Sequence, residues 1–264
     1  MKSSVTVIRQ TATVLLALCL LAMALPFAAD AQQSGSEVLI DRADKQNITG
    51  NTEIGFVWGQ QLEPPQSLLR GVINLMEAMN TWTKVETSLD RHLQLSDKRI
   101  MNIPFIFVTA DKQFELTQTE INNLREYIDN GGFIFADNAQ PAGENSMSGA
   151  ALKQMLKDVI PNARFEALQN SSEIYHSFFD FNDGPPLGAE LGASISNGET
   201  FISPQRLYLE GVRYKGRLVA VYSDKGYIVK WADELGSDPQ LRMGINLIVY
   251  ALTQDGSIAK QTLR

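Results

Sequence analysis

Hydrophobic and polar residues follow two different periods along this chain, and the two periods alternate. Continuous apolar runs, of the kind found in parallel strands buried on both faces, occupy residues 53–58, 103–109 and 132–137. Each run precedes a segment in which apolar residues recur every three or four positions, which predicts an amphipathic helix. The predicted helices cover residues 65–80, 117–130 and 148–160, and shorter strands are expected at 83–87 and 163–168.

The helix expected at 117–130 has the clearest start and end. Thr117 and Glu120 have the spacing of a capping box, in which each residue satisfies a backbone N–H of the other. Leu116 and Ile121 flank this start as a hydrophobic staple would. Asn130-Gly131 then ends the helix with residues that tolerate a left-handed backbone.

Strands that alternate with helices over this length predict an α/β fold. The expected architecture is a mostly parallel, doubly wound sheet covered on both faces, which is a flavodoxin-like three-layer sandwich. The second half departs from this rhythm, because residues 182–206 are rich in Gly, Pro, Ser and Asn. Residues 207–223 predict a β-hairpin with its turn at Lys215-Gly216, and a closing helix is expected from Asp238-Pro239 to about Thr253.

The N-terminal segment 1–31 has the layout of a secretory signal peptide. Lys2 and Arg9 flank an apolar stretch, and Ala29-Asp30-Ala31 supplies small residues for a cleavage site. A membrane anchor is the alternative, but the apolar stretch is shorter than the ~20 residues that span a bilayer. We therefore expect cleavage after Ala31 and an exported protein, periplasmic or extracellular, with no membrane span after signal removal.

Removal of the signal changes the chemistry available to the mature chain. The whole chain has a formal net charge of −7, and an acidic protein is a poor partner for nucleic acids and anionic membranes. The only cysteine, Cys19, leaves with the signal, which excludes a thiolate nucleophile, a disulfide and a cysteine metal ligand. The mature chain is expected to comprise a polar lead-in at 32–52, a single domain at 53–256 and a tail at 257–264.

Polar residues stand at the carboxyl ends of the predicted strands. Trp58, Thr109, Asp137 and Asp224 each end one strand, and in open α/β sheets these ends meet at one edge, where ligands bind. Asp137, Asn138 and Asp224 are therefore candidates for ligand binding. A helix or turn cap explains Asp137 and Asn138 equally well, and a plain turn explains Asp224.

We further expect the Asp137 and Asp224 carboxylates to lie next to each other, with Arg242 and His176 within reach. Two close carboxylates repel each other, so one should have a raised pKa unless a cation lies between them. Arg242 is the candidate cation within the chain, and a bound metal is the external one. No metal site is firmly indicated and no cofactor is expected, because the possible ligands are scattered along the chain.

Several other polar and aromatic residues allow two interpretations each. His176, beside Tyr175, is either a packing residue or a base, whereas His92 lies in a polar, helix-like stretch. Arg242 and Asn246 are one turn apart in the closing helix, and form either a solvated edge or a polar pair at the Asp137 rim that binds an anion. The aromatic residues expected near this rim suit either stacking on a sugar ring or a hydrophobic lid; they are Trp58, Trp231 and Tyr227.

Four blocks of the chain carry a resemblance to a known family. They are IPFIFVTADKQFELTQTEINNLREYIDNGGFIFADNA, EIYHSFFDF, GVRYKGRLVAVYSDKGYIVKW and LRMGINLIVYALT. In this order and spacing they resemble the bacterial domain-of-unknown-function family 4159, over about residues 53–253. The resemblance implies a fold similar to class I glutamine amidotransferases, members that are often secreted or membrane-attached, and no established reaction.

The sequence departs from the family pattern at two positions. The acidic pair that the family has after its fourth strand is matched by Asp137-Asn138, and the loss of one carboxylate would weaken a metal site. The family's His-Pro pair is matched by His176-Ser177, which lacks the rigidity of proline. Amidotransferases use a cysteine on a sharp turn, and the mature chain has neither this cysteine nor a G-x-S-x-G turn. Covalent amide chemistry is therefore excluded.

Three functions remain open, and the first is favoured because the nucleophile is absent. It is a non-catalytic module that binds a small ligand or an envelope partner. The second is a hydrolase of sugars or cell-wall material that acts through Asp137, His176 and Asp224, with or without a metal. The third is a scaffold subunit of an envelope complex, which agrees with the MoxR-type ATPases and von Willebrand-type proteins that often neighbour the family.

Overall fold

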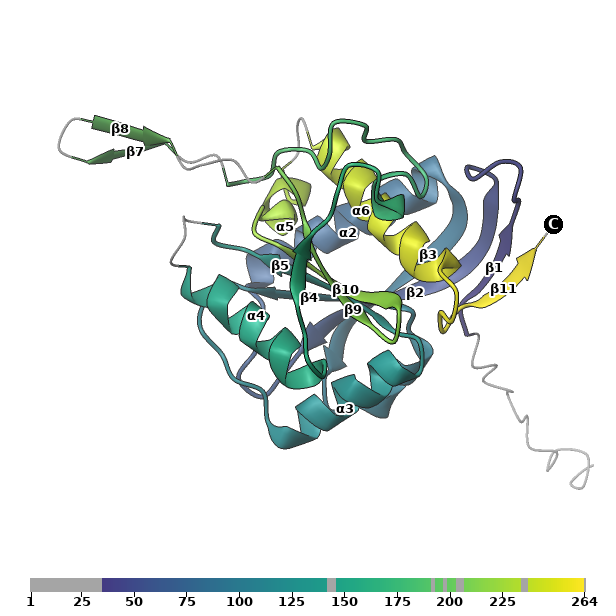
Figure 1. The fold of residues 1–264 in the computed structure, drawn as a ribbon, viewed down its shortest axis with the longest axis horizontal. Coiled ribbons are helices and arrows are strands. Elements are labelled where there is room, and N and C mark those ends of the chain that lie inside the picture. Colours follow the sequence, from purple (N-terminus) through teal and green to yellow (C-terminus); the bar gives the residue numbers. More distant parts are fainter. Residues whose placement is uncertain are drawn as a thin grey trace, which may run out of the picture. The chain divides into compact units, whose positions relative to one another are not determined.

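The computed structural model describes residues 35–141, 146–190, 193–196, 199–202, 207–233 and 237–263. The expected signal segment and its cleavage site after Ala31 lie outside the described residues. Within these residues, strands and helices alternate as the hydrophobic pattern predicts (Figure 1). No helix in the described part of the chain is long and apolar enough to cross a membrane.

Five parallel strands form the centre of the sheet in the described residues. They are β2 (Ile48–Trp58), β3 (Lys84–Gln94), β4 (Phe105–Ala110), β5 (Phe133–Asn138) and β10 (Arg217–Ser223). Their spatial order is β3-β2-β4-β5-β10, which is the 2-1-3-4-5 order of flavodoxin-like doubly wound sheets. The mostly parallel α/β sandwich predicted from the sequence is thus confirmed.

Shorter strands extend the sheet in two places. β9 (Glu210–Tyr214) pairs antiparallel with β10, and β6 (Phe165–Ala167) pairs antiparallel with β9. β1 (Glu37–Ile40) pairs antiparallel with the first residues of β2, on the edge of β2 that faces away from β3, and β11 (Lys260–Leu263) pairs parallel with β1. β1 and β11 lie in the segments expected as lead-in and tail, so both of these segments contribute to the sheet.

Helices cover the two faces of this sheet (Figure 1). α2 (Leu69–Trp82), α5 (Tyr227–Trp231) and α6 (Asp238–Thr253) pack on one face. α3 (Gln118–Asp129) and α4 (Met147–Val159) pack on the other face. Short 3-10 turns occupy Gln66–Leu68, Lys98–Asn102 and Glu173–Tyr175.

The alternation of side chains along the central strands divides the core into two layers. Phe105, Phe107, Phe133 and Phe135 point to the side of α2 and α6, and the aliphatic residues between them point to α3 and α4. The rings contact one another across the strands, with 5.5 Å between the ring centroids of Phe107 and Phe135. Because each buried ring contributes about 1.5–3 kcal/mol, this aromatic face strongly favours its coverage by helices.

The C-terminal hairpin and the closing helix are confirmed. Lys215 and Gly216 join β9 to β10 with φ angles of 51° and 81°, the pair of left-handed residues that a two-residue hairpin turn requires. α6 spans Asp238–Thr253 as expected, although Ser237, and not Asp238, occupies the position before its first turn.

Two local predictions differ from the structure, and a third segment contains strands that the sequence analysis did not name. The strand expected at 83–87 continues to Gln94, so the exposed His92 lies in a strand and not in a helix-like stretch. The helix expected from residue 65 begins as a 3-10 turn, which Pro65 precedes. The segment 182–206, for which the sequence analysis named no element, contains the short antiparallel pair β7 (Ala193–Ser196) and β8 (Glu199–Ile202).

The predicted capping box starts α3, and it also holds a neighbouring loop. Glu120 Oε2 accepts a hydrogen bond from the Thr117 backbone at 2.7 Å, and the Glu120 backbone donates to Thr117 Oγ1 at 3.3 Å. Glu120 is buried, and its Oε1 accepts from the backbone N–H of Gln60 at 2.7 Å. This second contact, which the sequence pattern does not reveal, ties the loop after β2 to the start of α3.

Two substitutions separate the cap from the loop contact. Thr117→Ala removes one N-cap oxygen and should lower the free energy of unfolding by ~1 kcal/mol. Glu120→Ala leaves the N–H groups of Gln60 and Thr117 without an acceptor and should cost roughly 2–3 kcal/mol. Urea denaturation measures both, with the exposed Glu126→Ala in the same helix as the matched control. Equal losses for Glu120→Ala and Glu126→Ala would contradict the loop contact.

Candidate functional site

The carboxyl ends of β4, β5 and β10 bring the predicted acids to one edge of the sheet. Thr109, Asp137 and Ser223 are partners in register on these three strands. Asp224 follows Ser223 directly, and its Oδ1 accepts a hydrogen bond from Asn138 Nδ2 at 2.7 Å. The structure therefore places Asp137 and Asp224 on neighbouring parallel strands at the same edge, as the sequence predicts.

The Asp137 carboxylate is buried beneath the first turn of α5. Its Oδ2 accepts from the backbone N–H of Ile228 at 2.9 Å, and its Oδ1 has no hydrogen-bond partner among the described residues. Gly226, with φ of 62°, lets the chain turn from β10 into this helix. Burial raises the pKa of Asp137 from 3.8 to about 7, and the Asp224 charge adds a smaller increase. The raised pKa thus comes mainly from burial and not, as expected, from the neighbouring acid.

Asn138 organises the polar groups around Asp137. Its Nδ2 donates to Asp224 and to Ser146 Oγ at 3.0 Å, and its Oδ1 accepts from Ser148 Oγ at 2.7 Å. The Tyr222 hydroxyl donates to the same Asp224 oxygen at 3.2 Å. A carboxylate at position 138 would face Asp224 Oδ1 without a proton to donate, so the amide is the group that this contact requires.

A buried ion pair lies beside this cluster, and the sequence reasoning missed it. Lys225 and Glu190 are almost inaccessible to solvent, and Lys225 Nζ lies 2.7 Å from Glu190 Oε1. Glu190 Oε2 accepts from the backbone of Gly188, and Lys225 O accepts from the backbone of Ala189. The pair holds the chain before β7 against the end of β10. No local signal indicates it, because the partners are 35 residues apart.

The position at which doubly wound sheets usually bind ligands is packed in this chain. It lies between β2 and β4, where the crossovers change from one face to the other. Gly59, after β2, is enclosed by Glu120, Leu62 and Leu95, and a Cβ at Gly59 would lie 2.8 Å from Glu120 Oε1. The described residues also contain no cluster of three His, Cys, Asp or Glu side chains that could hold a metal.

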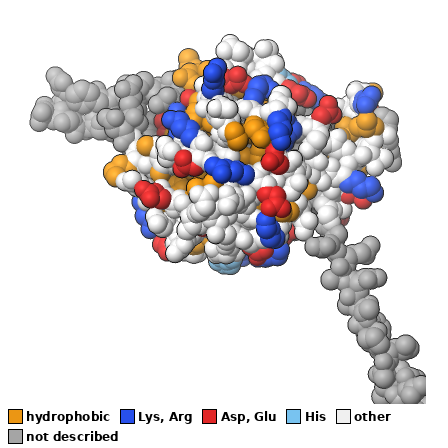
Figure 2. Space-filling model, turned by 60° about the horizontal axis from the view of Figure 1, so that its bottom comes forward, with side chains coloured by type: hydrophobic (Ala, Val, Ile, Leu, Met, Phe, Trp, Pro, Cys, Tyr) orange, Lys and Arg blue, Asp and Glu red, His pale blue; other side chains and the backbone are white. Residues whose placement is uncertain are grey.

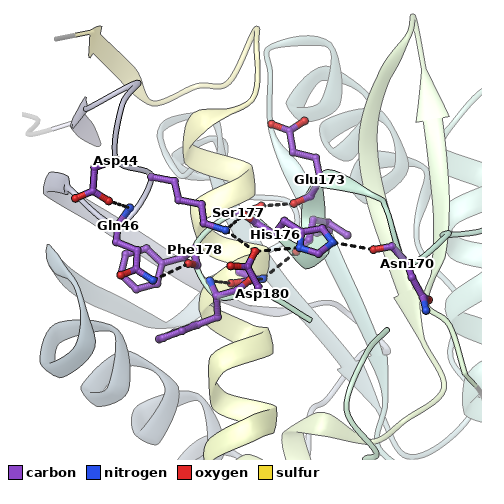
Figure 3. A network of polar contacts seen from close by, with 12 residues as sticks. Asp44, Gln46, Asn170, Glu173, His176, Ser177, Phe178 and Asp180 are labelled. Atoms are coloured by element: carbon purple, nitrogen blue, oxygen red, sulfur yellow. Dashed lines mark hydrogen bonds and ion pairs between the residues drawn. The ribbon is translucent and has the colours of Figure 1, made fainter. Parts of the chain in front are cut away.

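His176 has its own partners, away from the two acids. Its Nδ1 lies 3.0 Å from Asp180 Oδ1 and its Nε2 lies 2.8 Å from the Asn170 carbonyl oxygen (Figure 3). Lys45 Nζ donates to Asp180 Oδ1 at 2.5 Å, and this hydrogen bond, more than that of His176, lowers the pKa of Asp180. Among the described residues, no hydrogen bond or ion pair joins His176 to Asp137, so the predicted set of Asp137, His176 and Asp224 does not form.

The neighbouring hydroxyl does not supply a nucleophile to His176. Ser177 Oγ donates to the Glu173 carbonyl oxygen at 2.9 Å (Figure 3). Both ring nitrogens of His176 are occupied by Asp180 and Asn170, so neither is directed at Ser177. The arrangement therefore differs from a Ser-His-Asp triad, in which one ring nitrogen bonds the nucleophile and the other bonds the acid.

Arg242 and Asn246 face the same way, as expected, but they face a loop and not Asp137. Asn246 is fully buried; its Oδ1 accepts from the Phe179 backbone at 2.8 Å, and its Nδ2 donates to the carbonyl oxygens of Phe179 and Ile174. The Arg242 guanidinium lies over the rings of Phe179 and Trp82, at 5.1 and 5.7 Å from their centroids. The expected pairing of Arg242 with the Asp137 rim is absent from the described contacts.

The aromatic residues expected at the rim mostly belong to the core. Trp231 and Tyr227 are fully buried, and their rings stack with centroids 6.3 Å apart. Trp231 Nε1 donates to the Gln240 carbonyl oxygen at 2.8 Å. Neither ring offers a free face to a sugar. Trp58 is partly exposed and donates to the Arg91 carbonyl oxygen at 2.9 Å.

Two hollows occur away from the carboxyl edge. The larger, of about 780 Å³, lies by the β9–β10 turn, where Arg217 donates to the carbonyl oxygens of Ile128, Gly131 and Gly132 at the end of α3. The smaller, of about 330 Å³, is lined by Gln46, Trp82, Phe178, Phe179 and Arg242. The basic residues that line the larger hollow are all engaged by the chain itself, because Arg213 pairs with Glu166, Lys215 pairs with Asp129, and Arg217 binds these carbonyl oxygens at a helix C-terminus.

The buried Asp137 should make the stability of the protein depend on pH. Because its pKa is raised to about 7, the folded state keeps a proton that the unfolded state has lost, so this residue's contribution to stability falls as pH rises from about 4 to 7. The Asp137→Asn variant carries a neutral amide in place of the neutral carboxyl. As pH rises from about 4 to 7, the free energy of unfolding of this variant should therefore increase relative to that of wild type, by up to a few kcal/mol. Urea denaturation at several pH values tests this, with the exposed Asp183→Asn as control. Parallel pH profiles for wild type and Asp137→Asn would contradict it.

Asn246 should be essential for the loop between Ile174 and Phe179. Asn246→Leu keeps the shape but leaves one buried N–H and two carbonyl oxygens without partners, and should lower the free energy of unfolding by roughly 2–4 kcal/mol. The same change at the exposed Asn122 of α3 is the control. Denaturation combined with limited proteolysis should show cleavage in this loop only for Asn246→Leu, and an unaltered loop would disprove the role.

Comparison with known proteins identifies the family of the chain. A crystal structure of a protein described as ThuA-like, from Bacteroides uniformis ATCC 8492, is 10% identical and covers 77% of this chain and 92% of its own, with a TM-score of 0.36. This likeness is too low to bear on fold or function, and no curated protein matches. The model of the family described as "Domain of unknown function (DUF4159)" matches residues 65–252, which is more than half of the chain. The chain therefore belongs to the DUF4159 family.

Proposed function

We propose that this chain is an exported, non-catalytic binding module with an architecture like that of class I glutamine amidotransferases. The observation that carries the proposal is the internal use of the polar groups at the carboxyl edge. Asp137 caps α5, Asp224 accepts from Asn138 and Tyr222, and Lys225 pairs with Glu190. Export is supported by the signal-like pattern of residues 1–31.

The surface agrees with a ligand or partner that is not a polyanion. Lys and Arg side chains are interspersed with Asp and Glu side chains on the face shown in Figure 2, with small hydrophobic patches between them. A nucleic-acid site would require a continuous basic patch on the binding face. The net charge of −7 acts in the same direction, because it repels polyanions at long range.

One observation favours the alternative, a hydrolase of sugars or cell-wall material. A carboxyl group with a pKa of about 7 is suited to acid–base catalysis, and one oxygen of Asp137 has no partner among the described residues. However, a general acid must reach its substrate, and Asp137 is fully buried. The pKa of Asp137 is raised mainly by this burial, which does not require a catalytic role, so the binding module remains the better supported function.

Turnover distinguishes the two functions. The exported protein, with Gln32 expected as its first residue, is incubated with sugars, cell-wall fragments, organic acids and divalent cations, and thermal shift identifies those that bind. Each bound compound should be recovered unchanged by mass spectrometry from wild type and from Asp137→Asn alike. A product formed by wild type and lost in Asp137→Asn and Asp224→Asn would establish the hydrolase and overturn the proposal.

A further inference from the structure

We propose that the hollow between Trp82, Phe178, Phe179, Gln46 and Arg242 binds a small organic carboxylate with an apolar or aromatic body. We call this hollow the Arg242 pocket. The inference rests on the proposed function as a binding module and supplies its site and ligand class. It does not involve the carboxyl edge, so the two can be tested separately.

The walls of the Arg242 pocket are aromatic and come from distant parts of the chain. Trp82 ends α2, Phe178 and Phe179 follow the Glu173–Tyr175 turn, and Gln46 lies between β1 and β2. The Trp82 and Phe179 rings are nearly perpendicular at 6.2 Å, and the Phe178 and Phe179 rings are nearly perpendicular at 4.9 Å. The volume of about 330 Å³ is at the lower end of the range for small-molecule sites. The pocket therefore suits a single ring and a short substituent.

Arg242 is the only charged residue among the described residues that line the pocket. Its side chain is exposed, and it forms no ion pair with a described residue. Other arginines of the chain pair with acids: Arg213 lies 2.7 Å from Glu166, and Arg99 lies 2.7 Å from both Asp90 and Asp97. The Arg242 guanidinium carbon lies 5.1 Å from the Phe179 ring centroid and 5.7 Å from that of Trp82, and its N–H groups form no hydrogen bond with a described residue. A carboxylate matches the N–H edge of a guanidinium with two parallel hydrogen bonds.

The pocket is held in shape before any ligand binds. The Asn246 side chain accepts a hydrogen bond from the backbone N–H of Phe179 and donates one to the carbonyl oxygen of the same residue. Gln46 Nε2 donates to the Phe178 carbonyl oxygen at 3.3 Å, and Lys45 Nζ donates to the His176 carbonyl oxygen at 3.1 Å (Figure 3). The His176 and Asp180 network thus supports the loop that carries the two phenylalanines. Such preorganisation reduces the entropy lost when a small ligand binds.

The charge and the lining together select a monocarboxylate. One cation matches one negative charge, whereas a phosphate carries more charge than Arg242 alone can neutralise. The aromatic lining adds affinity only for a ligand with an apolar body, because inorganic anions bury no apolar surface. A neutral aromatic compound would fill the pocket but would leave the guanidinium without its acceptor.

Three probes with the exported protein test this assignment. Phenylacetate, its neutral isostere phenylacetamide and inorganic phosphate are titrated while the indole N–H signal of Trp82 is followed by NMR. Phenylacetate should bind at least about tenfold more tightly than phenylacetamide, because a charge-assisted hydrogen bond contributes more than a neutral one. Phosphate should not displace it.

Variants then assign the preference to Arg242. Arg242→Gln should remove the preference for the acid over the amide, and Arg242→Lys should retain only part of it, because lysine lacks the planar fork. Arg164→Gln, an exposed arginine before β6, is the matched control and should leave binding unchanged. Trp82→Leu should weaken the acid and the amide alike.

Several results would overturn the inference. They are equal affinity for phenylacetate and phenylacetamide, an unaltered preference in Arg242→Gln, displacement by phosphate, and no phenylacetate binding to folded wild type. None of these results shows turnover, so none of them refutes a binding module with another ligand. Product formation that depends on Asp137 would instead refute the proposed function and leave the pocket measurements intact.

Discussion

A mostly parallel sheet has to be covered on both faces, and the arrangement of this chain follows from that constraint. The central strands carry phenylalanines on one face and aliphatic residues on the other. α3 and α4 cover the aliphatic face as ordinary crossover helices. The aromatic face needs more cover than α2 provides, and the chain supplies it after β10 through α5 and α6, with Trp231 against Phe107 and Phe135.

The position of α5 explains why an acid is buried at the end of β5. The helix begins directly above this strand end, where its first N–H groups have no acceptor within the helix. Asp137 supplies that acceptor to the backbone N–H of Ile228, and its carboxylate is fully buried there. The raised pKa is therefore a consequence of covering the sheet. A perturbed pKa is a sign of function only where the group can also reach a ligand.

The carboxyl edge and the Arg242 pocket differ in how their charges are compensated. At the edge, Lys225 lies against Glu190, and the Asn138 amide lies against Asp224. In the pocket, the guanidinium of Arg242 lies over two aromatic rings and forms no ion pair with a described residue. A ligand carboxylate would supply the acidic partner that Arg242 lacks among the described residues, whereas the acids at the edge are already bonded within the chain, so the pocket is the better candidate for ligand binding.

The sequence by itself determined the elements of this fold that depend on local interactions. Periodic apolar residues, the Thr117–Glu120 cap and the Lys215-Gly216 turn act within a few residues, so the sandwich, the hairpin and the edge shared by Asp137 and Asp224 follow from them. Only the tertiary structure decided the partners of polar side chains. Arg242 meets Phe179, and Lys225 meets Glu190, across tens of residues. Such pairings depend on how the helices pack over the sheet, and no spacing along the chain encodes that packing.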